Sequence, residues 1–248
     1  MSFDKIIAVR TDKTVYRDGD RCLKVFGEEY SKADVLVEAL NQARAEEAGL
    51  SVPKLLGVTV TDGKWTIISE YIKGKALERI ALENPEKKEE CIAKLVDVQL
   101  EMQSKSCPKL RKLRDRLIEK INAADIPATV RYSIIARLAE LPTHNKICHG
   151  GFTLSNVILG DDGKTYILDW IHATRGNASA DAAFTYFRFG MSGASDDAER
   201  YLDLFCEKSG TEKQYVQKWM PVIATVQSVN GNAREREFLL PFINEINK

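Results

Sequence analysis

Two oxygen-bearing side chains in the second half of the sequence stand where they could hold a divalent cation. Asn156 ends the segment that begins at His149, and Asp169 follows a short predicted hairpin over residues 157–168. This arrangement places both side chains at one end of a β-ribbon. Amide and carboxylate oxygens suit Mg²⁺, a hard cation that takes its remaining ligands from water and phosphate groups. Taken singly, each residue has a simpler role as the cap of a turn or strand, and only their spacing favours a metal site.

That spacing resembles the catalytic loop of kinases. His149 and Asn156 are seven positions apart, as in the motif H-x-D-x-x-x-x-N, and Asp169 follows a hairpin as the metal-binding aspartate does there. The segments HGGFTLSN (149–156), LDW (168–170) and GNASAD (176–181) resemble the aminoglycoside phosphotransferase and choline kinase family of the protein-kinase-like fold. The resemblance extends over nearly the whole chain. It implies ATP and Mg²⁺ as cofactors, and a nucleotide and a small-molecule hydroxyl acceptor as binding partners.

The resemblance also implies roles for residues near the N-terminus. Lys24 matches the lysine that pairs with nucleotide phosphates, and Glu38 matches the acid that holds this lysine. Glu70 to Ile72 match the hinge, whose backbone groups bind the adenine edge, and residues 11–14 lie where the phosphate-covering loop belongs. Lys24 alternates with apolar neighbours, and a charge on a partly apolar face needs a partner or a ligand. As exposed surface residues, Lys24 and Glu38 would contribute little.

By the same resemblance, the catalytic residues are His149, which supports the loop, Asn156, and the residue at position 151. Gly151 stands where the family carries the aspartate that accepts the proton of the substrate hydroxyl, and glycine has no group for this. A positioned general base contributes on the order of 10²–10⁴-fold, or roughly 3–5 kcal/mol of barrier. Phosphoryl transfer passes through a loose transition state, so positioning and Mg²⁺ can carry much of the catalysis. We therefore expect slow or altered chemistry at a site that still binds nucleotide.

Gly151 also favours two alternatives. One is a pseudokinase, a nucleotide-binding or interaction module without turnover, and the other is a kinase-like fold with different transfer chemistry, such as nucleotidylation. His172, three residues after Asp169, either contacts substrate, takes over proton transfer, or is a plain hydrogen-bonded histidine. The chain has no G-x-G-x-x-G and no G-x-x-x-x-G-K-[ST] motif, so dinucleotide and P-loop sites are not expected.

The elements that must position these residues fall into two parts. Asp-Gly pairs at 18–19, 62–63 and 162–163 each join β-rich runs and predict hairpins. With a strand at 6–9, they predict an antiparallel sheet over the first seventy residues. One helix, at 32–48, interrupts it, with Leu36, Val37 and Leu40 at helical spacing. Further helices are predicted at 84–107, 110–122, 129–140, 179–190, 195–208 and 212–227.

The predicted fold is therefore α+β: a bilobal, protein-kinase-like fold with an N-terminal antiparallel sheet and one helix, followed by a larger helical C-terminal lobe. We expect the nucleotide-binding lobe at residues 1–72. The helical lobe at 73–248 would hold the catalytic loop and the acceptor site.

Composition excludes several other classes of protein. The 248 residues carry 36 Lys and Arg against 36 Asp and Glu, whereas a nucleic-acid-binding protein needs a basic face. No apolar run approaches the roughly 20 residues of a membrane helix, and charges interrupt the N-terminus, unlike a secretory signal. The five cysteines never form a C-x-x-C pair, so we expect reduced thiols in a cytoplasmic protein.

Overall fold

The computed structural model describes residues 4–10 and 12–245 and has the predicted α+β composition. By their contacts, the residues fall into two compact units. The first comprises the chain up to Glu83 together with Ser155–His172, and the second comprises Asn84–Leu154 and the chain from Ala173 onwards. The hairpin predicted over residues 157–168 thus belongs to the N-terminal unit. The predicted functional boundary between residues 72 and 73 stays a prediction.

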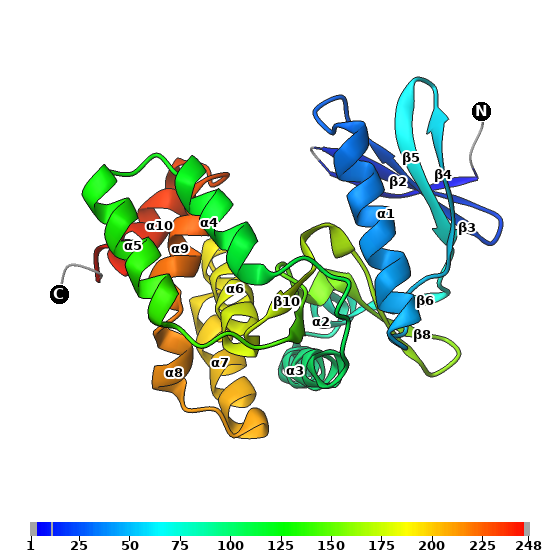
Figure 1. Cartoon of the computed structure of the whole chain (residues 1–248). Coiled ribbons are helices and arrows are strands. Elements are labelled where there is room, and N and C mark those ends of the chain that lie inside the picture. Colours follow the sequence, from blue (N-terminus) through cyan, green and yellow to red (C-terminus); the bar gives the residue numbers. More distant parts are fainter. Residues whose placement is uncertain (1–3, 11, 246–248) are drawn as a thin grey trace. The chain divides into compact units, whose positions relative to one another are not determined.

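The first unit contains the predicted antiparallel sheet and its one long helix. Its five strands are arranged in the order β1-β2-β3-β5-β4, and every neighbouring pair is antiparallel. Helix α1 lies against one face of this sheet (Figure 1). The elements are β1 (Lys5–Val9), β2 (Lys13–Asp18), β3 (Arg21–Phe26), α1 (Lys32–Glu47), β4 (Leu55–Thr61) and β5 (Lys64–Glu70).

Turn chemistry explains the hairpins of this sheet. Asp62 and Gly63 form the two-residue loop between β4 and β5, with φ of 50° and 78°. Positive φ at both positions is typical of the type I′ turn, whose twist matches that of the flanking strands. Between β2 and β3 the loop is Gly19 and Asp20, so the turn predicted at 18–19 is shifted by one residue. Gly19 has φ of 60°, which glycine adopts without steric cost.

Helix α1 has the predicted limits but buries a different face. Ser31 and Asp34 form a capping box at its start, and the chain turns away at Gly49, with φ of 80°. The predicted apolar stripe of Leu36, Val37 and Leu40 is exposed. The buried face instead combines small apolar residues with hydrogen-bonded polar ones: Val35, Glu38, Ala39, Asn41, Gln42 and Ala45. An apolar-periodicity argument misses this face because half of its residues are polar.

A second, three-stranded sheet completes the first unit. Its order is β6-β8-β9, and β8 and β9 form the third predicted hairpin. The Leu168 N–H, just beyond β9, donates to the Asn156 carbonyl oxygen over 2.8 Å. Asn156 therefore lies beside the residue that precedes Asp169. The elements are β6 (Gly74–Ala76), α2 (Leu77–Glu83), β8 (Val157–Gly160), β9 (Thr165–Ile167) and the 3-10 turns η2 (Leu154–Asn156) and η3 (Trp170–His172).

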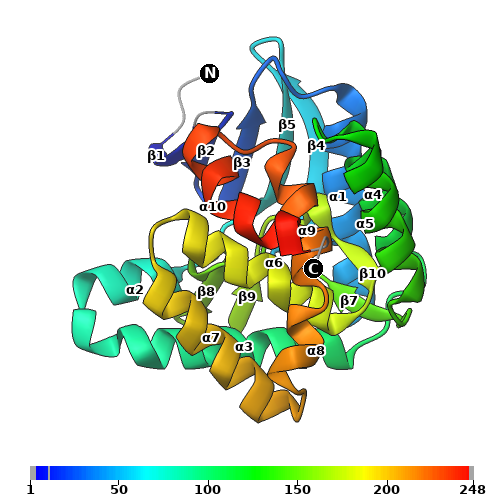
Figure 2. The same cartoon turned by 90° about the vertical axis from the view of Figure 1, so that its left-hand side faces the viewer.

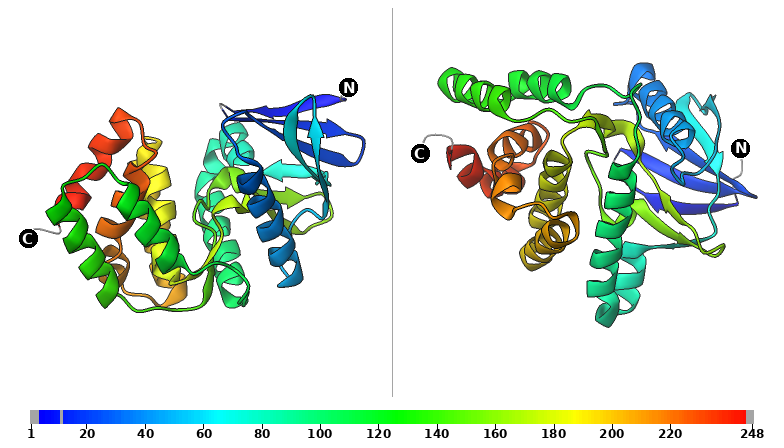
Figure 3. Two further views of the ribbon diagram at one scale, coloured as in Figure 1. Left: turned by 45° about the horizontal axis from the view of Figure 1, so that its top comes forward. Right: turned by 60° about the horizontal axis from the view of Figure 1, so that its bottom comes forward.

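The second unit is helical. Helix α6 packs against α7, α8, α9 and α10 (Figures 2 and 3), and β7 and β10 form a two-stranded sheet. The elements are η1 (Pro85–Lys87), α3 (Lys88–Ser104), α4 (Leu113–Ala123), α5 (Ala128–Glu140), β7 (Lys146–Cys148), β10 (Thr174–Gly176), α6 (Ala178–Met191), α7 (Ser195–Ser209), α8 (Lys213–Gln217), α9 (Met220–Ser228) and α10 (Ala233–Asn244).

The single helix predicted at 212–227 is wrong, because the structure has two helices there, α8 and α9. Pro221 stands in the first turn of α9. Proline lacks the N–H that would continue the earlier helix, but it is well tolerated where a new helix begins. Among the described residues, no helix combines the length and the apolar character needed to cross a membrane.

Candidate functional site

Three side chains predicted to act at the nucleotide site meet within the first unit. Lys24, on β3, reaches Glu38 on α1, and its Nζ donates both to Glu38 Oε1 and to Asp169 Oδ1, the latter over 2.6 Å. Glu38 is 2% exposed, whereas Asp169 keeps 29% of its side chain accessible. The lysine is therefore held between a buried carboxylate and one that faces open space.

Lys13 brings a second ammonium group to this cluster. Its Nζ lies 3.1 Å from Asp169 Oδ1 and 3.3 Å from Oδ2. Lys13 pairs with Phe26 across β2 and β3, which places it on the same face of the sheet as Lys24. The sequence placed this residue only within the phosphate-covering segment 11–14, of which Thr11 lies outside the described residues. The predicted hairpin pairs the strand of Lys13 with the strand of Lys24, and this pairing was a signal by which Lys13 could have been recognised as a site residue.

The charges of the cluster support one another. Burial alone would lower the pKa of Lys24, but the carboxylates of Asp169 and Glu38 outweigh it and raise this pKa. Burial would likewise raise the pKa of Asp169, yet Lys24 and Lys13 hold it well below the ordinary value. For Glu38, burial outweighs the attraction of Lys24, so its pKa is raised. Asp169 thus remains ionised at neutral pH and can accept a cation.

Asp169 and Asn156 are the two residues predicted to supply oxygen ligands to Mg²⁺. Asp169 has φ of 70°, a left-handed conformation uncommon for a residue other than glycine. Such backbone strain persists where surrounding contacts enforce it, often at functional sites. Within the described part of the chain, no cluster of three or more histidine, cysteine or acidic side chains could hold a metal ion. One carboxylate and one amide fit Mg²⁺ only if phosphates and water complete its coordination, as in nucleotide complexes.

In the predicted hinge, some backbone N–H groups already donate hydrogen bonds within the protein and one does not. The Glu70 N–H donates to the Lys54 carbonyl oxygen, and the Tyr71 N–H donates to that of Asp20, each over 2.9 Å. Over the described residues, the Ile72 N–H has no hydrogen-bond partner. A nucleotide base could therefore be met by the Ile72 N–H but not by the N–H of Glu70.

The loop that begins at His149 is anchored within the second unit. The Gly150 N–H donates to Asp181 Oδ1 over 2.8 Å, and Asp181 is fully buried on α6. Its Oδ2 accepts from Gln99 Nε2 at 3.1 Å and from Gln103 Nε2 at 3.3 Å, both on α3. Asp181 thus ties the start of this loop to α6 and α3. The two glutamines escaped sequence reasoning, although their i, i+4 spacing within an apolar helix face was a detectable signal.

The loop residues themselves differ in what their backbone allows. His149 is 1% exposed, and its ring packs edge-on against Phe152 with centroids 5.3 Å apart. Gly150 has φ of 75°, a conformation that favours glycine, whereas φ of Gly151 lies outside that region. An aspartate at position 151 would therefore meet no backbone strain.

Cys148 is completely buried, and burial raises its pKa, as expected for an inert thiol. His172 ends η3 and is half-buried.

Solved structures with the same fold are small-molecule kinases. A thermostable mutant of aminoglycoside phosphotransferase APH(4)-Ia, in a ternary complex with ADP and hygromycin B, is 15% identical with a TM-score of 0.70, over 99% of this chain and 94% of that one. Choline kinase LicA from Streptococcus pneumoniae is 15% identical with a TM-score of 0.66, over 100% and 93%. A choline/ethanolamine kinase family protein from Mesorhizobium loti is 16% identical with a TM-score of 0.62, over 100% and 87%. The predicted protein-kinase-like fold is confirmed.

The sequence itself identifies the family. The model of the phosphotransferase enzyme family, APH, matches residues 7–216, and the chain belongs to this family. No curated protein matches the sequence.

Proposed function

We propose that the protein is an ATP- and Mg²⁺-dependent phosphotransferase that acts on a hydroxyl group of a small molecule. The observation that carries this proposal is the cluster of Lys24, Glu38, Lys13 and Asp169 in a chain of the phosphotransferase family. Structural neighbours were solved with ADP or AMP, which supports nucleotide binding. The five free cysteines, and the predicted absence of membrane or nucleic-acid partners, fit a cytoplasmic enzyme.

Each side chain of the cluster has a distinct task in this proposal. Lys24 and Lys13 donate to the phosphate oxygens, and Glu38 keeps the ammonium group of Lys24 oriented. Asp169 and Asn156 would hold Mg²⁺, and the ion would supply positive charge that offsets the negative charge of the phosphates. Lys13 must then move from Asp169 towards the nucleotide, because the ion and the ammonium group compete for the same carboxylate oxygens.

The hinge and the loop that begins at His149 have roles of their own in this proposal. The Glu70 carbonyl oxygen and the Ile72 N–H receive the adenine edge. His149 supports the catalytic loop from its buried position, and Asn156 continues the loop to the metal site. Because Gly151 offers no base, the proton of the acceptor hydroxyl passes to the transferred phosphoryl group or to a base on the acceptor. The expected consequence is slow turnover, since a positioned base contributes on the order of 10²–10⁴-fold.

The test measures ATP turnover with hygromycin B and choline as the first acceptors. One structural neighbour was solved with hygromycin B bound, and another is a choline kinase. Mass spectrometry of the product distinguishes phosphorylation from nucleotidylation. The matched variants are Asp169→Asn, which removes the metal-binding carboxylate, and Asp162→Asn in the exposed hairpin loop as control. Loss of phosphorylated product in D169N but not in D162N supports the proposal, whereas an adenylylated product contradicts it.

Gly151 favours one alternative, a pseudokinase that binds nucleotide without turnover. The backbone at position 151 accepts an aspartate, so Gly151→Asp is a clean test. A gain of about 10²-fold or more in turnover would identify a competent site that lacks only its base. Nucleotide binding without turnover in both the unaltered protein and G151D would establish the pseudokinase instead.

A further inference from the structure

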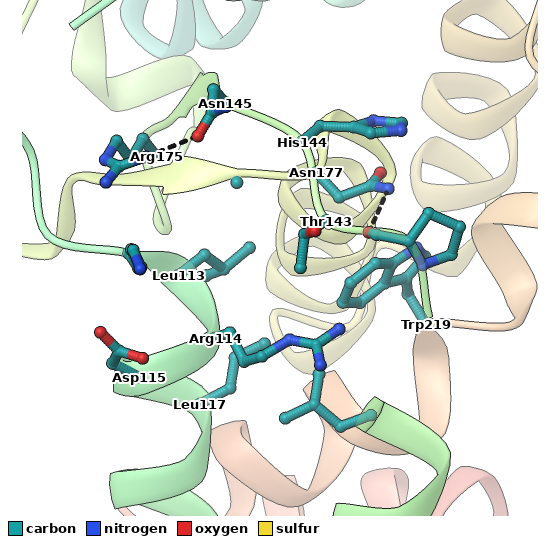
Figure 4. A pocket seen from close by; sticks show the side chains of 14 residues that line it. Leu113, Arg114, Asp115, Leu117, Thr143, His144, Asn145, Arg175, Asn177 and Trp219 are labelled. Carbon is teal, nitrogen blue, oxygen red and sulfur yellow. Dashed lines mark hydrogen bonds between the residues drawn. The ribbon is translucent and has the colours of Figure 1, made fainter. Parts of the chain in front are cut away.

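A cavity of about 520 Å³ lies entirely within the second unit, whereas Lys24, Glu38 and Asp169 belong to the first. The first turn of α4, the segment 142–145, β10 and Trp219 form its walls (Figure 4). Sites for small molecules typically measure about 300–1,000 Å³. The cavity is therefore large enough for a ligand of the size of a sugar phosphate.

The charges on its walls are predominantly positive. Lys112, Arg114 and Arg175 line the cavity, and Asp115 is the single carboxylate among its lining residues. Over the described residues, none of the three cationic side chains has an ion-pair partner. Unneutralised charges in a concave site concentrate the field and attract ligands of opposite sign. The cavity is suited to an anion and disfavours a cationic amine.

Both arginines are held in place by neutral oxygens. Arg114 Nη2 donates to the Leu141 carbonyl oxygen over 2.6 Å. Arg175 donates from Nε to the Leu110 carbonyl oxygen over 3.1 Å and from Nη1 to Asn145 Oδ1 over 2.5 Å. These contacts fix the two guanidinium groups without neutralising them. A ligand would therefore lose little free energy in ordering them, and their remaining N–H groups can bind an anion with charge-assisted hydrogen bonds.

Trp219 borders the cavity with its indole ring. Its side chain is 3% exposed, and the indole nitrogen is buried, out of reach of a ligand in the cavity. Helix α4 also begins at the cavity, and Lys112 at its N-cap makes no side-chain capping bond. The first-turn N–H groups add further donors for an anion.

We propose that this cavity binds a small organic phosphate. A phosphate dianion presents three terminal oxygens in different directions, which suits the donors of Lys112, Arg114 and Arg175 on α4 and β10 better than the two coplanar oxygens of a carboxylate. The organic part of the ligand would lie against Leu117, Leu138 and Pro142, which also line the cavity. The site shares no residue with the Lys24–Glu38–Asp169 cluster.

Calorimetry on the full-length protein tests the site with glucose 6-phosphate, inorganic phosphate and succinate as probes, and glucose as the uncharged control. We expect glucose 6-phosphate to bind best and glucose not to bind. Arg114→Gln and Lys112→Gln should each weaken binding by about tenfold or more, since hydrogen bonds to charged groups contribute about 1.5–3 kcal/mol. Arg111→Gln is the matched control, because Arg111 is an exposed neighbour paired with Glu119 outside the cavity.

Several results would overturn the proposal. These are no binding of any anionic probe at about 10 mM, equal weakening by R111Q and R114Q, or tighter binding of succinate than of both phosphates. Binding that disappears in Lys24→Met but survives in R114Q would place the probe at the nucleotide cluster instead. Lys112 is exposed, and over the described residues its side chain has no hydrogen bond or ion pair, so K112Q remains informative if R114Q fails to fold.

Discussion

Replacing Lys24 with methionine removes the cation between two carboxylates but keeps much of the aliphatic side chain. Glu38 then lies 2% exposed without its hydrogen-bond partner, whereas Asp169 retains Lys13. Breaking a buried ion pair from one side costs about 3–5 kcal/mol. Protonation of Glu38 limits this loss. Starting from the ordinary pKa of 4.5, keeping this carboxyl group protonated costs about 1.4 kcal/mol per pH unit, or about 3.4 kcal/mol at pH 7. We expect K24M to lose about 3 kcal/mol of unfolding free energy at that pH.

Two further measurements make this prediction specific. In K24M the pKa of Glu38 rises further, so stability is retained below pH 4.5 and lost as pH rises through the new pKa. The loss should therefore shrink to about 1 kcal/mol at pH 5. Adding Glu38→Gln to K24M removes the stranded charge and should restore about 2 kcal/mol at pH 7.

Denaturant unfolding at both pH values measures these free energies. Lys75→Met is the control, because its ion pair with Glu83 is exposed to solvent and should contribute little to stability. The electrostatic reasoning is refuted if the effects of K24M and E38Q simply add, or if the loss in K24M is the same at pH 5 and pH 7.

Three other perturbations have defined outcomes. Asp181→Ala leaves the Gly150 N–H and two glutamine amides buried without an acceptor. We therefore expect D181A to lose about 3 kcal/mol or more of unfolding free energy in denaturant, and Asp181→Asn to lose less. Unchanged stability of D181A would contradict the anchoring role. Because the pKa of Asp169 is lowered, this residue contributes stability above pH 3.8 that is lost as pH falls below that value. The unfolding free energy of D169N should therefore fall less steeply with decreasing pH than that of the unaltered protein. An equally steep fall in both proteins would disprove this. Cys148 should be labelled by a thiol reagent only on unfolding and after Cys22 in mass-mapped time courses, and early labelling would show an accessible thiol.

Local chemistry made part of this structure predictable. The glycine of each Asp-Gly pair has positive φ, and each of the three predicted hairpins is present, although only Asp62 and Gly63 form the loop as predicted. The motif spacing around His149, Asn156 and Asp169 indicated the fold because such spacing reflects a fixed loop and hairpin geometry. Lys24 on a partly apolar strand needed a partner, and α1 provides it through Glu38.

The remaining features depended on packing between distant segments. The buried face of α1 is half polar because Asn41 and Gln42 bond to carbonyl oxygens at Trp170 and Pro53, which no local pattern reveals. Gln99 and Gln103 were detectable as polar residues on an apolar helix face, but their acceptor Asp181 lies 82 and 78 residues further along the chain, so their partner was not. The cationic cavity likewise joins residues from four segments, of which none has a distinctive sequence pattern.

Nucleotide binding by the Lys24–Glu38–Asp169 cluster is most directly tested by calorimetric titration of the full-length protein with ATP, with and without Mg²⁺. We expect Mg²⁺ to strengthen ATP binding to the unaltered protein. In K24M the affinity for ATP should fall about tenfold or more, and in D169N it should no longer depend on Mg²⁺. K75M should bind as the unaltered protein does. Absence of ATP binding under both conditions, or equal binding by K24M and K75M, would contradict the assignment of this cluster as a nucleotide site.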